Sequence, residues 1–229
     1  LVTYYGAKVY TFDKNGETIE WERSKLSLPG KLSDRQIKQW QDMVKEAQGK
    51  LELDRPLYGP DGCIDSKVIV YNRDNLLFVF EMLDRTRLPD QVGVRINEHL
   101  VKEGIPPMSK REGAYDMGDT LVEFLNQRCQ EQGLPVIAEK AGIMGAVNMR
   151  LAQADRGRVI SDIVSILRRK RPQYKIYVIG KGNAAILDNL PPDDTTGIYF
   201  RWEPTGNLCS NARIWNEVLN GKQRIKGVI

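Results

Sequence analysis

The alternation of apolar and polar residues near the amino terminus predicts a β-hairpin. Aromatic and β-branched residues dominate positions 3–12, and a second run of this kind covers positions 17–22. Between the two runs lies Asp13-Lys14-Asn15-Gly16. An Asn-Gly pair suits a tight hairpin turn because glycine accepts the positive φ that such a turn needs. We therefore expect two antiparallel strands here.

Helical spacing replaces the alternation after Ser33. Gln36 stands three residues beyond Ser33, which is the spacing of a capping box, and Gly49 suits the end of the helix. The apolar positions between them recur every three or four residues, at Ile37, Trp40, Val44 and Ala47. The hairpin and this helix together predict an N-terminal module over residues 1–62, closed by a turn-rich segment at 56–62.

Short apolar runs and helical patterns alternate through the remaining residues, 63–229. The pattern predicts strands at 67–71, 135–138, 175–179 and 197–202. It predicts helices at 75–85, around His99 and over 159–171, and a further helix that begins at a Thr120/Glu123 capping box and ends at Gly133. For 75–85 a strand is the alternative, because the run is so apolar. This order predicts an α/β fold with a Rossmann-like, mainly parallel sheet flanked by helices.

Composition narrows the class of protein. Hydrophobic residues make up 41% of the chain, which is ample for a packed core, and no run of 18 apolar residues predicts a membrane span. Three widely spaced cysteines without a Cys-x-x-Cys motif indicate reduced thiols, so we expect a cytoplasmic or nuclear protein. The single histidine, His99, excludes a zinc site built from several histidines. We expect no cofactor and no membrane partner. Leu1 at the start indicates a piece of a larger polypeptide.

Positive charge is concentrated in the C-terminal half. The net charge is +4, yet nine basic residues against two acidic ones lie between Arg150 and Lys181. Arginines hold phosphate oxygens bidentately, and a cluster of cations releases counterions from a polyanion. The alternative is a solvated helix end whose cations are favoured by the helix dipole. We expect a nucleic-acid-binding domain, for RNA in particular, rather than an enzyme.

The predicted binding residues follow this charge through the end of a helix and the next strand. At the strand's carboxyl end a glycine turn would let the backbone approach an anion closely, although it matches neither a P-loop nor Gly-x-Gly-x-x-Gly. The predicted phosphate contacts are Arg168, Arg169, Lys170, Arg171, Lys175, Gly180, Lys181, Gly182 and Asn183.

Two other functions remain open from the sequence. Asp65-Ser66-Lys67, with Asp54 or Asp61 upstream, resembles a nuclease arrangement in which two carboxylates hold a divalent metal and a lysine positions water. A structural or assembly protein that meets an acidic partner with its basic face is the third possibility.

From about Lys67 to Trp202 the order of elements resembles the MID domain of Argonaute and Piwi proteins. The resemblance is carried by Leu121-Val122-Glu123-Phe124-Leu125 through Gly133-Leu134-Pro135-Val136, by Tyr177-Val178-Ile179-Gly180-Lys181-Gly182, and by Asp194-Thr195-Thr196-Gly197-Ile198. It implies a Rossmann-like fold that holds the 5′ end of a guide strand. The family's tyrosine, followed four residues later by lysine, has no counterpart in 183–188. The resemblance therefore implies a phosphate contact for Lys181 alone.

Overall fold

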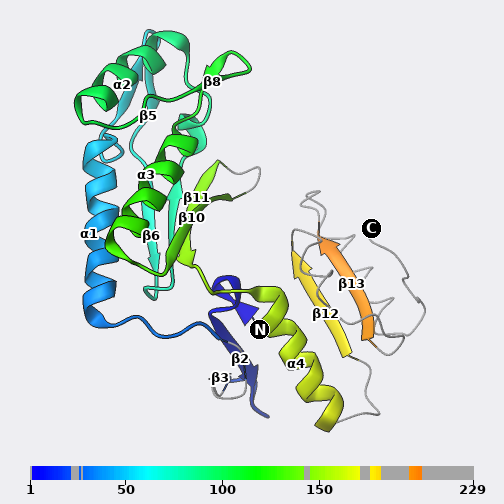
Figure 1. Ribbon diagram of the computed structural model, residues 1–229. Coiled ribbons are helices and arrows are strands. Elements are labelled where there is room, and N and C mark those ends of the chain that lie inside the picture. The colour runs from blue at the N-terminus through cyan, green and yellow to red at the C-terminus, as the bar shows by residue number, and fades with distance from the viewer. Residues whose placement is uncertain are drawn as a thin grey trace. The chain divides into compact units, whose positions relative to one another are not determined.

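The chain forms two compact units, and the sequence of one unit interrupts the sequence of the other. The computed structural model describes residues 2–21, 26, 28–141, 145–170, 176–181 and 196–202. Unit 1 combines Leu1–Leu28 with Asp155–Ile229, and unit 2 is the continuous segment Pro29–Ala154 (Figure 1). The boundary expected at residue 62 lies within unit 2, at the start of β5 (Gly62–Asp65).

Unit 1 begins with a small antiparallel sheet in the order β1 (Val2–Thr3), β2 (Lys8–Phe12), β3 (Thr18–Glu20). The predicted hairpin is confirmed, since β2 pairs with β3. Its turn is closed by the Asp13 carboxylate, which accepts the backbone amides of Asn15 (2.8 Å) and Glu17 (2.9 Å). Gly16 has a φ of 84°, which is the conformation that required glycine.

Helix α4 (Arg156–Lys170) covers this sheet within unit 1. Val159 and Ile166 of α4 form a buried cluster with Val9 of β2 and with Leu26. After α4 come β12 (Ile176–Lys181) and β13 (Thr196–Trp202), which pair in parallel. Among the described residues, this is the one parallel pair.

The described residues of unit 2 form three α-helices, α1 (Asp34–Lys50), α2 (Asp90–Lys102) and α3 (Met117–Gln132). Its main sheet has the order β10-β11-β7-β6, with strands β6 (Ile69–Arg73), β7 (Leu77–Glu81), β10 (Val136–Ala141) and β11 (Ala146–Leu151). Short hairpins β4 (Leu57–Gly59)–β5 and β8 (Lys110–Arg111)–β9 (Ala114–Tyr115), a 3₁₀ turn η3 (Leu83–Arg85) and the loops between them complete the unit.

The mainly parallel sheet expected for residues 63–229 is wrong for unit 2, because every strand pair in its main sheet is antiparallel. The sheet is built from two hairpins, β6–β7 and β10–β11, and a hairpin reverses the chain without a helical crossover. The mixed α/β class is confirmed. The segments that carry the MID resemblance fall in both units, 121–136 in unit 2 and 177–198 in unit 1.

Two local predictions in unit 2 are corrected by turn and cap geometry. The segment expected as helix 75–85 contains strand β7, because Asp74 and Asn75 have φ of 55° and 54° and reverse the chain in a hairpin. Helix α3 starts at Met117, where the Asp116 side chain accepts the amide of Gly118. Thr120 therefore lies inside α3 rather than capping it. Gly133 ends α3 in the left-handed conformation, as predicted.

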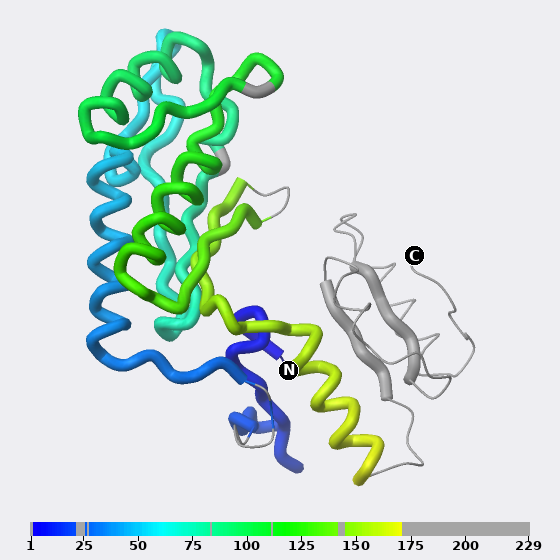
Figure 2. The backbone as a smooth tube through the Cα atoms, viewed as in Figure 1, coloured from blue at the N-terminus to red at the C-terminus, as the bar shows by residue number. Residues whose placement is uncertain are grey.

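The core of unit 2 lies between its sheet and the pair α1 and α3, which pack against each other. Trp40 of α1 is fully buried, with its ring 5.0 Å from that of Phe78 and its indole N–H 3.4 Å from the sulfur of Met149. The capping box of α1 is present as predicted, with Ser33 and Gln36 bonding reciprocally. Figure 2 follows the chain from α1 through the sheet to β11.

Candidate nucleic-acid interface

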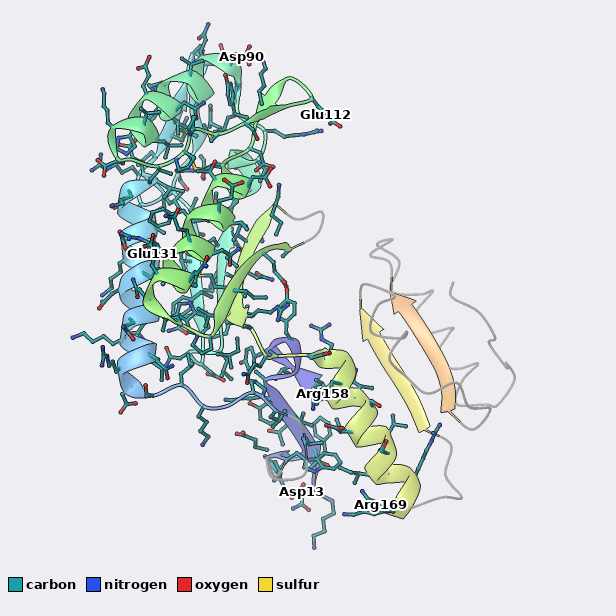
Figure 3. All side chains as sticks on the ribbon, in the orientation of Figure 1. Asp13, Asp90, Glu112, Glu131, Arg158 and Arg169 are labelled. Carbon is teal, nitrogen blue, oxygen red and sulfur yellow. The ribbon has the colours of Figure 1, made fainter. Side chains whose placement is uncertain are left out.

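Helix α4 has an apolar side and a polar side on which two arginines are exposed. Val159, Ile163 and Ile166 recur at helical spacing and pack into the core of unit 1. Arg158, Ser165 and Arg169 are exposed, and separations of 7 and 11 residues put them on one side of the helix. Figure 3 marks Arg158 near the start of α4 and Arg169 near its end. At 1.5 Å per residue the two arginines are about 16 Å apart along the helix axis.

The cations predicted in the last turn of α4 differ in how exposed their side chains are. Arg169 and Lys170 are exposed, as a phosphate contact requires. Arg168 is half-buried, with its Nε and Nη2 atoms shielded from solvent. The structure thus adds Arg158 to the exposed cations and turns Arg168 inward. Arg171, Lys175, Gly182 and Asn183 lie outside the described residues.

Gly180 and Lys181 are strand residues in the structure. Both belong to β12, where they pair with Arg201 and Trp202 of β13, so the strand includes the first two residues expected to form the glycine turn. Helix α4 contacts β12, whose first residue is Ile176 and whose last is Lys181. Lys181 therefore lies at the far end of β12 from the end that follows Lys170. Six strand residues separate those ends by about 16 Å.

Aromatic residues next to α4 are a feature that the sequence reasoning missed. The 3₁₀ turn η1 (Tyr4–Gly6) packs against the start of α4. The Arg156 guanidinium lies 5.3 Å from the centre of the Tyr5 ring, and the Lys8 ammonium lies 5.9 Å from that of Tyr4. The signal available in the sequence was the pair of tyrosines followed directly by glycine.

Asp65, the central carboxylate of the nuclease alternative, is paired with an arginine in the structure. The Asp65 carboxylate accepts a 2.7 Å hydrogen bond from Nε of Arg85, which is buried. Asp54, Asp61 and Lys67 are all exposed. In the described part of the chain, no group of three or more histidine, cysteine, aspartate or glutamate side chains could hold a metal ion.

The single histidine has a structural position in unit 2. Nε2 of His99, in the last turn of α2, lies 2.9 Å from the backbone carbonyl oxygen of Lys50 at the end of α1. The ring therefore satisfies one of the carbonyls that a helix leaves unpaired at its carboxyl end.

A lysine and two aspartates form a surface cluster in unit 2. Nζ of Lys140 lies 2.5 Å from Asp116 and 3.1 Å from Asp119. Burial opposes the charge of Lys140, but these hydrogen bonds outweigh it and raise its pKa above the ordinary 10.5. Asp116 also lines a shallow cavity of about 620 Å³ together with Thr86, Arg87 and the β8–β9 hairpin. The cluster holds the start of α3 against β10.

The cysteines differ in accessibility. Cys63 is exposed on β5, whereas Cys129 is buried with its sulfur 3.7 Å from that of Met43. Burial raises the pKa of the Cys129 thiol to about 12, so it is not a nucleophile at neutral pH. Cys209 lies outside the described residues.

Comparisons with known proteins leave the family of this chain open. No protein-family model matches the sequence. No curated protein matches it either. Among solved structures, a Plasmodium falciparum IMP-nucleotidase is similar with a TM-score of 0.42 and 9% sequence identity, over 96% of this chain and 44% of that one. The chain thus spans less than half of the length of that protein. None of the described helices has the length and apolar character to span a membrane.

Proposed function

We propose that unit 1 is a nucleic-acid-binding module, for RNA in particular, which holds phosphates on the exposed side of α4. The observation that carries the proposal is the two-sided character of this helix. Its apolar side is buried against β2, while Arg158, Arg169 and Lys170 remain in solvent.

The spacing of these cations suits a polyanion better than a single small anion. Arg158 and Arg169 are about 16 Å apart along the helix axis, too far to share one phosphate group. A chain of phosphates could contact both ends of α4 at once. Each contact would release a condensed counterion, which is the main source of sequence-independent affinity for nucleic acids.

The test compares two triple variants of the full chain that carry the same change in net charge. The first is Arg158→Ala/Arg169→Ala/Lys170→Ala on α4. The matched control is Arg35→Ala/Lys38→Ala/Lys45→Ala, three residues that are exposed on α1 of unit 2. Binding of a labelled 20-nucleotide RNA is measured by fluorescence anisotropy.

We expect the α4 variant to lose most of its affinity and the α1 variant to retain most of it. Equal losses in both variants would mean that net charge alone attracts the RNA, and the assignment of the site to α4 would be wrong. An absence of RNA and DNA binding by the unmodified chain at 50 mM salt would overturn the proposed function itself. In that case a partner protein with an acidic surface becomes the better explanation of the basic side.

A further inference from the structure

A small cavity in unit 2 is lined by α3, by the end of α1 and by the loop that follows α2. Its volume is about 210 Å³, the space of roughly seven water molecules. Helix α3 contributes Thr120, Glu123, Phe124 and Gln127, which recur at separations of three and four residues and therefore share one side of the helix. A ligand of about six or seven non-hydrogen atoms would fill this space.

One polar side chain of this lining is buried and has no hydrogen-bond partner among the described residues. Thr120 is 5% exposed, and its hydroxyl is bonded to no other residue that the structure describes. Buried polar groups are nearly always hydrogen-bonded, because an unpaired one loses the bonds that it would make with water. The Thr120 hydroxyl therefore indicates a polar partner inside the cavity.

The charges of the lining indicate the sign of that partner. Both cations that line the cavity are already paired, since Lys50 lies 3.4 Å from Glu46, and Arg128 pairs with the same carboxylate and with a second one on α3. Within the described part of the chain, the carboxylates of Glu103 and Glu123 pair with no cation. The uncompensated charge of the lining is therefore negative, and it favours a cationic ligand.

Two apolar side chains of the lining show that the ligand has a hydrocarbon part. Ile105 and Phe124 are both buried and line the same cavity as the two glutamates. A hydrated metal ion would gain nothing from contact with these side chains, whereas a hydrocarbon chain placed on them would be removed from water.

We propose that this cavity binds a short aliphatic diamine. Its two ammonium groups pair with Glu103 and Glu123, and its carbon chain packs on Ile105 and Phe124. The Thr120 hydroxyl accepts a hydrogen bond from one of the ammonium groups. A diamine with four carbons has about six non-hydrogen atoms, which matches the volume of the cavity. The site belongs to unit 2 and does not depend on the nucleic-acid function proposed for unit 1.

The experiment titrates 1,4-diaminobutane into the isotope-labelled full chain and follows the chemical shifts of the backbone amides. Butane-1,4-diol, which has the same length without charge, and succinate, which carries the opposite charge, are titrated in parallel. Glu123→Gln is compared with Glu98→Gln, an exposed glutamate of α2 outside the cavity. Thr120→Val, which removes the hydroxyl, is compared with Thr120→Ser, which keeps it. The same spectra check that each variant is folded.

We expect the diamine to shift the amides around the cavity with a Kd on the order of 1 mM, because a ligand of this size makes few contacts. Glu123→Gln should weaken binding about threefold and Thr120→Val about fivefold, whereas Glu98→Gln and Thr120→Ser should bind like the unmodified protein. The diol and succinate should cause no saturable shift.

Three results would overturn the proposal. They are the absence of a saturable shift with the diamine, binding of the diol or of succinate in its place, and equal losses of affinity in Glu123→Gln and Glu98→Gln. If Thr120→Val does not fold, the comparison of Glu123→Gln with Glu98→Gln decides, because both of these glutamates are exposed.

Discussion

Replacing Arg85 by methionine should destabilise unit 2 more than any other single change to its charged residues. Arg85 is 1% exposed, and its guanidinium makes three hydrogen bonds. Nε donates to Asp65, while Nη1 and Nη2 donate to the backbone carbonyls of Glu52 (2.9 Å) and Arg55 (2.6 Å). The side chain therefore ties η3 to β5 and to the loop after α1.

The size of the effect follows from what the substitution leaves behind. Methionine fills similar space but donates no hydrogen bond, so the Asp65 carboxylate, 13% exposed, loses its partner. Removing one partner of a buried ion pair costs about 3–5 kcal/mol. With a urea dependence of about 2 kcal/mol per molar, the midpoint of unfolding should fall by roughly 2 M.

The buried thiol of Cys129 reports on unit 2 alone. In a background of Cys63→Ser and Cys209→Ser, a short pulse of alkylating reagent at each urea concentration labels Cys129 only in chains whose unit 2 has opened. The matched control is Arg55→Met, because the side chain of Arg55 is 69% exposed and pairs with Glu52 at the surface. Exposed pairs contribute less than about 1 kcal/mol, so this control should barely shift the midpoint.

A double variant separates the cost of lost contacts from the cost of an unpaired charge. Asp65→Leu added to Arg85→Met should recover part of the lost stability, because no buried carboxylate is then left without a cation. If Arg85→Met shifts the midpoint no more than Arg55→Met does, the Arg85 contacts do not stabilise unit 2 and the reasoning is refuted.

Three further outcomes follow from packing and charge in unit 2. Gly93→Ala should destabilise unit 2 by about 1–3 kcal/mol, since a Cβ there would lie 2.0 Å from an aromatic ring. Gly49→Ala has open space around it and should raise the unfolding free energy by about 0.5 kcal/mol. Urea titrations compare the two variants, and equal effects would contradict the packing. Under native conditions Cys63 should be alkylated within minutes and Cys129 only after unfolding, and peptide mass spectrometry would show which cysteine is labelled. Rapid labelling of Cys129 would argue against its burial. Because the folded pKa of Lys140 is raised, its ion pairs stabilise the fold below pH 10.5, and this stability is lost as pH rises through the folded pKa. The urea midpoint of unfolding, measured from pH 9 to 12, should therefore decline less in Lys140→Met than in the unmodified protein. An unchanged decline would count against those ion pairs.

Local signals in the sequence predicted single elements well. The hairpin turn at Asp13–Gly16, the Ser33 cap of α1 and the Gly133 end of α3 are all confirmed, because each depends on residues within a few positions of one another. The register of α4 was also predictable from its apolar spacing. The exposure of Arg169 follows from that register, whereas Lys170 lies on the side of Val159, Ile163 and Ile166 and is exposed as the last residue of the helix.

The direction of the strands could not be predicted in this way. The apolar run after Asn75 suits a buried helix or a strand equally, and the turn residues Asp74 and Asn75 were the overlooked evidence for a hairpin. Strand β11 was not expected, and it pairs with both β10 and β7, which lie at different distances along the chain. Such pairings depend on long-range packing, and so does the inward turn of Arg168.

The salt dependence of RNA binding tests the central claim most directly. For single strands the slope of log affinity against log salt is about −0.7 for each phosphate contact, so losing Arg158, Arg169 and Lys170 should make the slope shallower by about 2. The measurement titrates single-stranded RNA at several salt concentrations between 50 and 200 mM with the α4 and α1 triple variants. Our account predicts a shallower slope for the α4 variant and an unchanged slope for the α1 variant. An unchanged slope for the α4 variant would contradict it.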